Sequence, residues 1–547
     1  MDRGGERRIA WRPVSLVAAI AAAVHLTVTT RFGWHHDEFY YVMCGRHPAF
    51  GYVDQPPLAP LLARFADAAG GLLGAQLLGV RLLAVAAQTG CVVLTAMLAA
   101  RLGGRGAAQT LAAAAVAASP VFVAASLLFG TTVLDQVTWA AVFVLVTRAL
   151  ADPRPVRWWM GAGMVAGAGL EAKDTVAVLM LGIAIGLVCY RREVLRTPGP
   201  WLAAGTASVL AAPNLVWDAL HGWPNLTMDR VLSQQQGGPL GSLARFAELP
   251  LLLAGTALIG IWYSGLRWLA APENREHRWL LPTTGVVVAV FIAGGGKVYY
   301  AAPLLVALFA AGAVRMEVAV RRRLAGVDAG SVSSSVSSSV SSSVSSSVSS
   351  SVSSSVSSSV SSSESEKPTE SSVARALRRE VRIPLAISFA ISLIIGLPIL
   401  PASAATAVRD VNPELMQTYG WPQIVHQVAE AAAPLPAQVP IFAGDFGEAG
   451  ALTILGPSQG LHRAVYSGHD SYTYWGPPPG SPDLVLCVGT FQADDLRRFW
   501  NQVDEIAPIM LPDSLKNAET VRHAAIYLCR QPRGTWAQLW PQLQHID

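Results

Sequence analysis

A few acidic and basic side chains, set in a long apolar chain, have the types that group-transfer chemistry needs. Asp37 and Glu38 are adjacent in the stretch WHHDEFYY, and Asp135 follows the stretch LLFGTTVL. A carboxylate can act as a general base that removes the proton of an attacking group. Lys173 and Lys297 can stabilise negative charge that develops on a leaving group. We therefore treat these five residues as candidates for one catalytic centre.

The elements that must position these residues are apolar segments of roughly 18–22 residues, each long enough to cross a hydrocarbon core about 30 Å thick. Of the 547 residues, 52% are hydrophobic and only 14% are charged. A soluble domain carries about 25% charged residues, so the composition excludes a protein that is water-soluble throughout. We predict about eleven transmembrane helices. Their ranges are 13–30, 77–100, 107–125, 132–150, 157–172, 174–190, 200–217, 248–268, 279–294, 299–320 and 383–403.

The first apolar segment has a competing interpretation as a cleaved signal peptide. No small-x-small cleavage site precedes the WHHDEF stretch, so we expect a retained helix. Basic residues occupy the N-terminal segment and alternate connections, for example Arg191, Arg192 and Arg196, whereas the intervening short loops nearly lack them. By the positive-inside rule the N-terminus is cytoplasmic, in a multi-pass protein of the cell membrane. This orientation places every candidate residue on the extracytoplasmic side.

Further polar side chains fall in the predicted outer loops. Tyr299 and Tyr300 follow a lysine in the stretch GGGKVYY and offer hydroxyl groups beside it. The candidates for contacting a substrate or acceptor are Tyr40, Tyr52, Asp54 and His221. Ionisable groups near a membrane boundary are costly, so a set that gathers on one side indicates a site. The alternative is that each residue merely caps a helix or meets lipid headgroups.

The predicted organisation has four parts. These are a transmembrane domain at 1–325 with an outer loop at 31–76, a linker at 326–381, a final helix at 382–403 and an outer domain at 404–547. The linker contains a Val-Ser-Ser-Ser repeat over 331–363, which is low in complexity and has no means of burying a core. We expect a flexible cytoplasmic spacer there, with a serine phosphorylation platform as the alternative.

The outer domain has a mixed pattern that predicts an α/β fold. IFAGDFGEAGALTIL reads as strand, turn and helix, DLVLCVGTF as a strand, and DDLRRFWNQVDEI as an amphipathic helix. Cys487 and Cys529 lie on strand-like segments, and an oxidising compartment would allow them to form a disulfide. We expect no cofactor and no nucleic-acid partner, with a divalent metal held by histidine and carboxylate side chains as the alternative to a metal-free site. His35, His36 and other loop histidines lie near carboxylates, but no spacing typical of metal ligands supports an ion site.

The first outer loop carries a helix signal of its own. Pro56 and Pro57 suit the first turn of a helix. Apolar residues then repeat at helical spacing, at Leu58, Leu61, Leu62 and Phe65. A helix with this apolar stripe is expected to lie in the plane of the membrane interface rather than to cross it.

Several motifs, in order along the chain, carry a resemblance to a known family. They are HHDEFYYV with GYVDQPPL, LLFGTTVLDQVTW, GAGLEAKDTVAVLM, APNLVWDALHGWPN and GGGKVYYAAPL. The chain resembles glycosyltransferase family 39, the membrane clan with the GT-C fold that includes protein O-mannosyltransferases and the bacterial lipid A aminoarabinose transferase. In the outer domain, NPELMQTYGWPQIV, GDFGEAGAL and SGHDSYTYWGPPPG resemble the tail of a bacterial subgroup of these enzymes.

The resemblance implies an enzyme that moves a hexosyl or pentosyl group from a polyprenyl-phosphate-linked donor to an extracytoplasmic protein, lipid or cell-wall glycan. Asp37 matches the family's catalytic acid, with Glu38 orienting or coordinating beside it, and Asp135 matches a second acid. Lys297, Tyr299, Tyr300 and Lys173 are expected to bind the lipid phosphate. Direct attack at the anomeric carbon would invert its configuration.

Three departures from the family pattern bear on the acceptor. Gln136 follows Asp135 where the family often has proline, the chain has about eleven predicted spans where some relatives have more, and it carries a long serine repeat. The rival functions are a polytopic lipid or sugar transporter and a non-catalytic glycan-binding or scaffold protein. A transporter is expected to have paired repeats and charges near the bilayer midplane, whereas the charges here gather at one surface. Turnover of a lipid-linked donor by purified protein separates an enzyme from both rivals.

Overall fold

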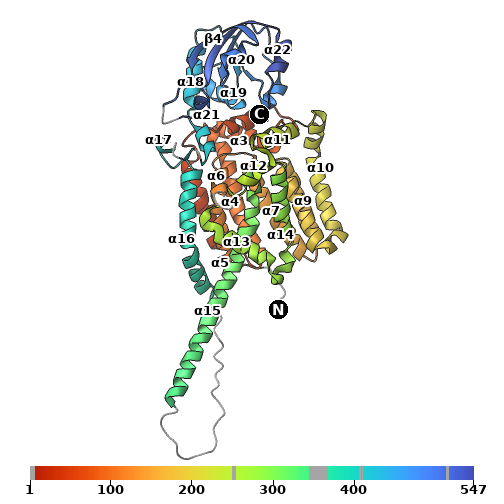
Figure 1. The fold of residues 1–547 in the computed structure, drawn as a ribbon, viewed down its shortest axis with the longest axis vertical. Helices are drawn as coiled ribbons and strands as arrows, with labels where there is room; N and C mark the ends of the chain where they lie inside the picture. The colour runs from red at the N-terminus through yellow and green to blue at the C-terminus, as the bar shows by residue number, and fades with distance from the viewer. Residues whose placement is uncertain are drawn as a thin grey trace, which may run out of the picture.

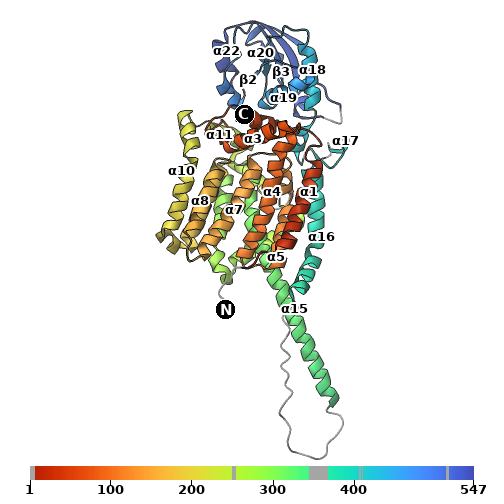
Figure 2. The ribbon, with the colours of Figure 1, turned by 180° about the vertical axis from the view of Figure 1, so that it is seen from behind.

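A computed structural model describes residues 7–248, 254–343, 368–405, 408–409, 411–512 and 516–546, with the backbone alone for 327–343. The molecule has a bundle of long helices and, stacked on one end of it, a small domain built around a sheet (Figures 1 and 2). The N-terminal end of the chain and the far end of the long helix α15 lie at the opposite end of the bundle (Figure 1). The bundle and the sheet domain correspond to the predicted transmembrane and outer domains.

Helices occupy the predicted apolar segments. They are α1 (Trp11–Val28), α4 (Gln76–Arg101), α5 (Gly106–Ala117), α6 (Pro120–Ala125), α7 (Thr131–Ala151), α8 (Val156–Leu170), α9 (Thr175–Tyr190), α10 (Pro198–Leu220), α13 (Ile259–Ala270), α14 (Leu280–Ala293), α15 (Leu305–Ser343) and α16 (Glu370–Gly396). Within the described residues, four helical segments are both long and apolar enough to cross a membrane: Trp11–Val28, Gln76–Arg101, Thr131–Ala151 and Val298–Gly326. The larger number of about eleven spans therefore stays a prediction.

Shorter helices form the loops at the end of the bundle that faces the sheet domain. They are α2 (His36–Arg46), α3 (Leu58–Leu72), α11 (Pro224–Gln235), α12 (Gly238–Arg245) and the 3-10 helix η5 (Val298–Leu304). The remaining short elements of the bundle are η1 (Arg192–Arg196), η3 (Thr256–Leu258) and η4 (Pro272–His277).

Helix α3 starts where Pro56 and Pro57 predict it. Its small residues Ala59 and Ala63 are buried, whereas Phe65, a member of the predicted apolar stripe, is 71% exposed. An apolar face that the protein itself leaves open suits a helix lying at the membrane interface.

Several boundaries differ from the predictions, among them the predicted span 248–268, whose α-helix α13 begins only at Ile259. The segment 107–125 is two helices, because the backbone is extended at Ser119 and Pro120 starts a new helix with no N–H to donate. Helix α15 continues to Ser343, into the serine repeat expected to be flexible. Adding residues to an existing helix is much easier than starting one, and serine lowers helix stability only modestly. Residues 344–367, the rest of the predicted linker, lie outside the described residues.

The last helix of the bundle, α16, begins well before the predicted start at 382. Thr369 caps its first turn by accepting a hydrogen bond from the Ser372 amide at 3.3 Å. The Glu370 carboxylate then pairs with Arg105 at 2.9 Å and with Arg321 of α15 at 2.6 Å. These ion pairs hold the start of α16 against the bundle.

The outer domain is an α/β fold, as predicted. Its sheet has the order β2-β1-β3-β5-β4, in which β1 is parallel to β2 and β3, and β5 is antiparallel to β3 and β4. The strands are β1 (Ile441–Ala443), β2 (Val465–Ser467), β3 (Leu484–Gly489), β4 (Trp500–Pro508) and β5 (Ala525–Pro532). The helical elements are α17 (Ala402–Ala405), η7 (Pro413–Thr418), α18 (Trp421–Ala432), α19 (Phe446–Leu455), η8 (Gly456–Gln459), η9 (Asp470–Trp475), α20 (Ala493–Leu496), α21 (Ala518–Val521) and α22 (Trp536–Leu543).

The strand-turn-helix prediction at β1 and α19 and the strand at β3 are confirmed, but the amphipathic helix in DDLRRFWNQVDEI is wrong. Only Ala493–Leu496 is helical, and Trp500–Pro508 forms the edge strand β4. Trp500 is fully buried, and its strand pairs with β5 along the sheet edge. Strand pairing with a segment distant in sequence overrides the local helical period.

Candidate functional site

The Asp37–Glu38 pair lies in the first turn of α2. His35 is the N-cap residue, and its ring Nδ1 accepts a hydrogen bond from the Asp37 amide at 3.2 Å. The Glu38 carboxylate in turn accepts from the His35 amide at 2.9 Å. This reciprocal arrangement is a capping box, which satisfies backbone donors that a helix start otherwise leaves open. The two acids therefore have fixed and different orientations.

Glu38 points into the protein and is fully buried against Arg81 of α4, itself 1% exposed. Arg81 donates from Nε to Glu38 Oε1 at 3.0 Å and from Nη2 to Oε2 at 2.9 Å. The Phe129 amide donates to Oε1 at 3.0 Å, and the His35 amide to Oε2. Both carboxylate oxygens are thus occupied. Glu38 was expected to orient or coordinate beside Asp37, and because neither of its oxygens is free for a substrate, the geometry suits the orienting role and not direct catalysis.

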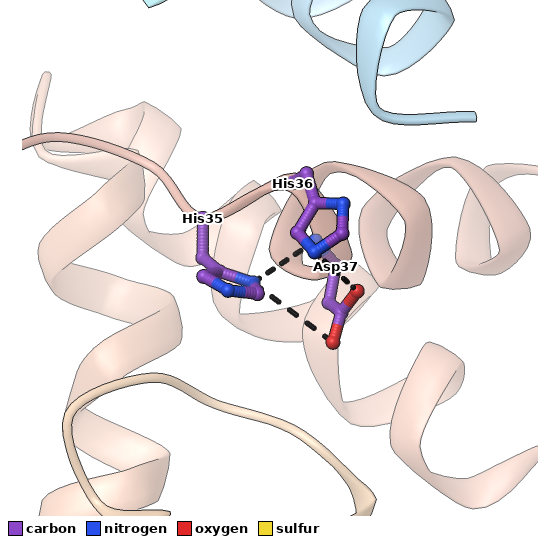
Figure 3. Close-up of side chains that lie close together, drawn as sticks. All are labelled: His35, His36 and Asp37. Carbon is purple, nitrogen blue, oxygen red and sulfur yellow. Dashed lines mark hydrogen bonds and ion pairs between the residues drawn. The ribbon is translucent and has the colours of Figure 1, made fainter. Parts of the chain in front are cut away.

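Asp37 points outward, with a side chain that is 37% exposed. Its Oδ1 lies 3.3 Å from Nε2 of His36, and its Oδ2 lies 3.9 Å from Nδ1 of His35 (Figure 3). Nε2 of His35 lies 3.2 Å from the Glu414 carboxylate in η7 of the outer domain. Of the acid pair, Asp37 is the member that a substrate can reach.

A second group of candidates surrounds Lys173, in the turn between α8 and α9. Its ammonium group donates to Thr132 Oγ1 at 3.1 Å and lies 4.7 Å from the ring centre of Tyr300 and 5.4 Å from that of Tyr299. These are cation–π distances. Asp135 of α7 is 2% exposed, and its Oδ1 accepts from Thr175 Oγ1 at 2.8 Å. The structure thus brings together Lys173, both tyrosines and the second acid.

Electrostatic interactions connect this group to the first outer loop. The pKa of Lys173 is lowered to about 8, chiefly by burial and also by the positive charge of Lys297, while Asp135 and Asp37 oppose the change. Lys297, half-buried at the start of η5, therefore acts on the same ammonium group as both acids. A carboxylate that can accept a proton and two lysines that can bind an anion share one region.

The four residues predicted to contact substrate differ in burial and in the partners that they contact. Tyr40 is buried, and its hydroxyl lies 2.8 Å from Asp54 Oδ1 and 2.7 Å from Ser471 Oγ of the outer domain. Asp54 itself is exposed. Tyr52 is 2% exposed, and its hydroxyl donates to the Cys44 carbonyl at 2.8 Å, so it fixes the loop and is unavailable to a substrate.

His221 lies at the end of α10, apart from these residues. Its Nδ1 is 2.7 Å from the Trp217 carbonyl, and its ring stacks on the Trp217 ring with centres 4.0 Å apart. Its other aromatic contact is with Tyr474 of the outer domain, at 5.4 Å between centres. His221 therefore lines the junction between α10 and the outer domain.

The outer domain packs directly on α2. Helix α19 crosses it at two glycines: a Cβ atom added at Gly447 would lie 2.7 Å from His36 Cβ, and one at Gly450 would lie 2.5 Å from Phe39 Cβ. Phe39 and Tyr40 belong to the same buried cluster as Ile441 of β1. The first outer loop and the outer domain thus share one hydrophobic core, which fixes the position of the acid pair.

The predicted disulfide partners are adjacent but not joined. Cys487 of β3 and Cys529 of β5 are both buried, and their sulfur atoms lie 3.4 Å apart. Both are free thiols in the structure. The strand-like segments were identified correctly, and their pairing explains the contact.

Two clusters of side chains have donor atoms close enough to share a metal ion. His35, His36 and Asp37 form the first, and Asp445, Glu448 and Glu519 of the outer domain form the second. In the first cluster both ring nitrogens of His35 already have partners, the Asp37 amide and Glu414. That leaves two ligands, fewer than the three protein ligands of a typical catalytic zinc site. The second cluster is one that the sequence did not predict.

Sequence reasoning missed Arg81, Glu414 and Ser471. Arg81 had a signal, because it is the only charged residue in the apolar segment 77–100, and a buried charge in such a segment implies a partner. Glu414 and Ser471 contact the first outer loop from positions 379 and 431 residues away along the chain. No local pattern predicts such contacts.

Comparison with known proteins bears on the class of this molecule. Residues 54–217 match the family of dolichyl-phosphate-mannose-protein mannosyltransferases. The fold is similar to that of ArnT from Cupriavidus metallidurans bound to undecaprenyl phosphate, with a TM-score of 0.58, 14% sequence identity, and coverage of 95% of this chain and 98% of that chain. The apo form of ArnT gives a TM-score of 0.57 at 14% identity, with coverage of 94% and 97%.

The S. cerevisiae protein O-mannosyltransferase Pmt1-Pmt2 complex gives a TM-score of 0.33 at 15% identity, covering 41% of this chain and 35% of that chain. A TM-score that low is not evidence of a shared overall fold. No curated protein sequence matches the chain.

The fold and the matched segment define a membrane glycosyltransferase of the GT-C type. The match over residues 54–217 and the ArnT-like fold confirm the predicted resemblance to glycosyltransferase family 39, although the motifs HHDEFYYV and GGGKVYYAAPL lie outside the matched segment. The transporter and the non-catalytic scaffold are thereby set aside.

Proposed function

We propose that this glycosyltransferase moves a sugar from a polyprenyl-phosphate-linked donor to an acceptor on the extracytoplasmic side of the cell membrane. One observation carries the proposal: the partly exposed acid Asp37 and Lys297 both act electrostatically on Lys173, so the three charges share one region. The similarity to ArnT, which binds undecaprenyl phosphate, supports a lipid phosphate as the leaving group.

In the proposed reaction, an acceptor hydroxyl attacks the anomeric carbon of the sugar. Its oxygen bonds to that carbon as the carbon–oxygen bond to the phosphate breaks, and Asp37 takes the hydroxyl proton. The bonding electrons leave with the lipid phosphate, whose charge Lys173 and Lys297 stabilise. A single displacement of this kind inverts the anomeric configuration.

The buried acids then act on this arrangement indirectly. Glu38 holds the start of α2 through Arg81, and Asp135 lies next to Lys173 and Thr175. Asp135 is expected to keep Lys173 protonated and correctly placed for the phosphate. Tyr299 and Tyr300 contact the same lysine and offer hydroxyl groups to the donor.

Two substitutions test the assignment. Asp37→Asn keeps the shape of the side chain but removes the base, so donor turnover is expected to fall by about 10²–10⁴-fold while donor binding survives. Lys297→Ala is expected to weaken both binding and rate, because its charge acts in the ground state and in the transition state. Binding and turnover constants for both variants, measured with purified protein, check this. Normal turnover by Asp37→Asn would contradict the proposal and would move the base to Asp135.

The orientation is part of the proposal. The N-terminal end and the extension of α15 lie at one end of the bundle and the outer domain at the other, which suits a cytoplasmic N-terminus and an extracytoplasmic C-terminus (Figure 1). A reporter that is active only in the cytoplasm, fused after Asp547, is expected to be silent. Reporter activity would reverse the orientation and place the acid pair inside the cell.

A further inference from the structure

Three carboxylates from two elements of the outer domain meet beside α2. Asp445 is the N-cap residue of α19, Glu448 is in its first turn, and Glu519 is in α21. Oxygen atoms from the three side chains lie within 4.8 Å of one another. None of the three takes part in the reaction proposed above.

The two glutamates are buried, and one carboxylate oxygen of each has no hydrogen-bond donor. Glu448 is 2% exposed and Glu519 is 3% exposed. Glu448 Oε2 accepts hydrogen bonds from the Gly444 amide at 2.9 Å and the Asp445 amide at 3.1 Å, but Glu448 Oε1 has no partner. Glu519 Oε2 has none either. Buried acceptor atoms normally have a donor, so two orphaned oxygens in one cluster require an explanation.

The cluster has little compensating positive charge. In the part of the chain that the structure describes, the charge of Arg522 acts on Glu519, but Arg522 forms no ion pair with any of the three acids. Burying carboxylates without a positive partner is strongly unfavourable. Either a bound cation or a proton must be present in the folded protein.

We propose that Asp445, Glu448 and Glu519 bind a divalent cation that prefers oxygen ligands, and that this cation is Ca²⁺. Carboxylate oxygens are the ligands that hard cations select, and Ca²⁺ accepts an irregular set of carboxylates, carbonyls and waters. Thiolate or imidazole ligands, which softer metals favour, are absent from this cluster as the structure describes it.

The pKa shifts agree with this arrangement. The pKa of Glu519 is raised to about 7, chiefly by burial and then by the charge of Asp445, while a hydrogen bond with Glu448 and the charge of Arg522 oppose the change. Burial and then Asp445 and Glu519 raise the pKa of Glu448 as well.

The position of the cluster gives the ion a structural consequence. It would join the N-terminus of α19 to α21, and α19 is the helix whose Gly447 and Gly450 contact α2. The charge of Asp445 also acts on His36, the partner of Asp37. The ion would therefore fix the surface of the outer domain on which the acid pair rests.

Calorimetric titration of the purified full-length chain, stripped with EDTA and titrated with CaCl₂, tests the proposal; a parallel titration uses MgCl₂. We expect saturable binding of one Ca²⁺ per chain. Glu519→Gln is expected to weaken it at least about tenfold, the lower end of what changes around metal ligands cause. Glu505→Gln, which changes an exposed carboxylate on β4, is the matched control and is expected to bind normally.

Two further variants make the result decisive. If Glu519→Gln fails to fold, Asp445→Asn, at the partly exposed edge of the cluster, replaces it with the same expectation. Asp37→Asn is expected to bind Ca²⁺ like the wild type. No binding to the wild type would overturn the proposal and show that the glutamates share a proton instead, and equal binding by Glu519→Gln would overturn it by showing that the ion lies elsewhere. Loss of binding in Asp37→Asn alone would move the ion to the first outer loop. Because the readout is binding, it is independent of the proposed transferase activity.

Discussion

The two members of the acid pair are expected to separate into one that sets stability and one that sets rate. Glu38→Gln leaves the shape of the side chain nearly unchanged but removes its charge. Four N–H groups point at its two oxygens: two from Arg81 and one each from the His35 and Phe129 amides. A glutamine offers one oxygen and turns an NH₂ group toward donors. The guanidinium of Arg81 is then left buried and uncompensated.

The magnitude follows from the burial of both partners. Breaking a fully buried ion pair by removing one charge costs about 3–5 kcal/mol. Arg81 also donates to the Gly33 carbonyl at 2.7 Å and to the Thr29 carbonyl, which will keep it in place rather than let it reach solvent. Asp37→Asn changes a partly exposed pair, for which about 0–1 kcal/mol is expected. The two neighbouring substitutions should thus differ several-fold in their effect on stability.

The assay is unfolding of the purified chain in mixed micelles, with donor turnover measured on the same samples. We expect Glu38→Gln to unfold much more easily, and the double variant Glu38→Gln/Arg81→Met to recover most of the loss, because it removes both buried charges. Wild-type stability in Glu38→Gln, together with a 100-fold or larger loss of turnover, would refute this reasoning and make Glu38 a chemical participant.

Three other outcomes are expected. Because the pKa of Lys173 is about 8, its charge is present below pH 8 and lost above it. Binding of a polyprenyl phosphate should therefore weaken up to about tenfold from pH 7 to 9, whereas Lys173→Arg should show no such change. Gly450→Ala should destabilise the chain by about 1–3 kcal/mol, because the added Cβ would meet Phe39. The control Gly205→Ala places its Cβ in open space and should unfold like the wild type. Equal stability of the two variants would contradict the packing of α19 on α2. Deleting residues 331–363 should leave turnover within about threefold, since a spacer adds reach and not contacts, and a complete loss of activity would give the repeat a role.

The parts of the fold that could be predicted are those with a strong local signal. Apolar segments such as 77–100 and 132–150 became α4 and α7 almost to the residue, because length and hydropathy act within each segment. The strand β4 was missed, since its pairing with β5 comes from a distant segment that no local window contains. The break at Pro120 was visible in the sequence but was outweighed by the apolar run around it.

In the site, too, features with a local sequence signal could be predicted and features set by distant segments could not. The Asp37–Glu38 pair and the lysines were found from their residue types, and the structure brings Lys173 beside Tyr299 and Tyr300 as the resemblance implied. What the sequence did not show is which acid faces inward. That depends on Arg81, 43 residues further along the chain. Contacts of the outer domain with α2 are more remote still and have no counterpart in local patterns.

The packing of α19 on α2 has a consequence for how the enzyme is made. A ribosome adding about 5–20 residues per second needs roughly 20–80 s to go from Tyr40 to Gly450. During that interval, the faces of Phe39 and Tyr40 that α19 and Ser471 later cover have no partner on the nascent chain. The first outer loop is therefore completed only by nearly the last part of the protein to be synthesised. A truncated product that inserts its helices correctly would still lack the surface of the outer domain on which the acid pair rests.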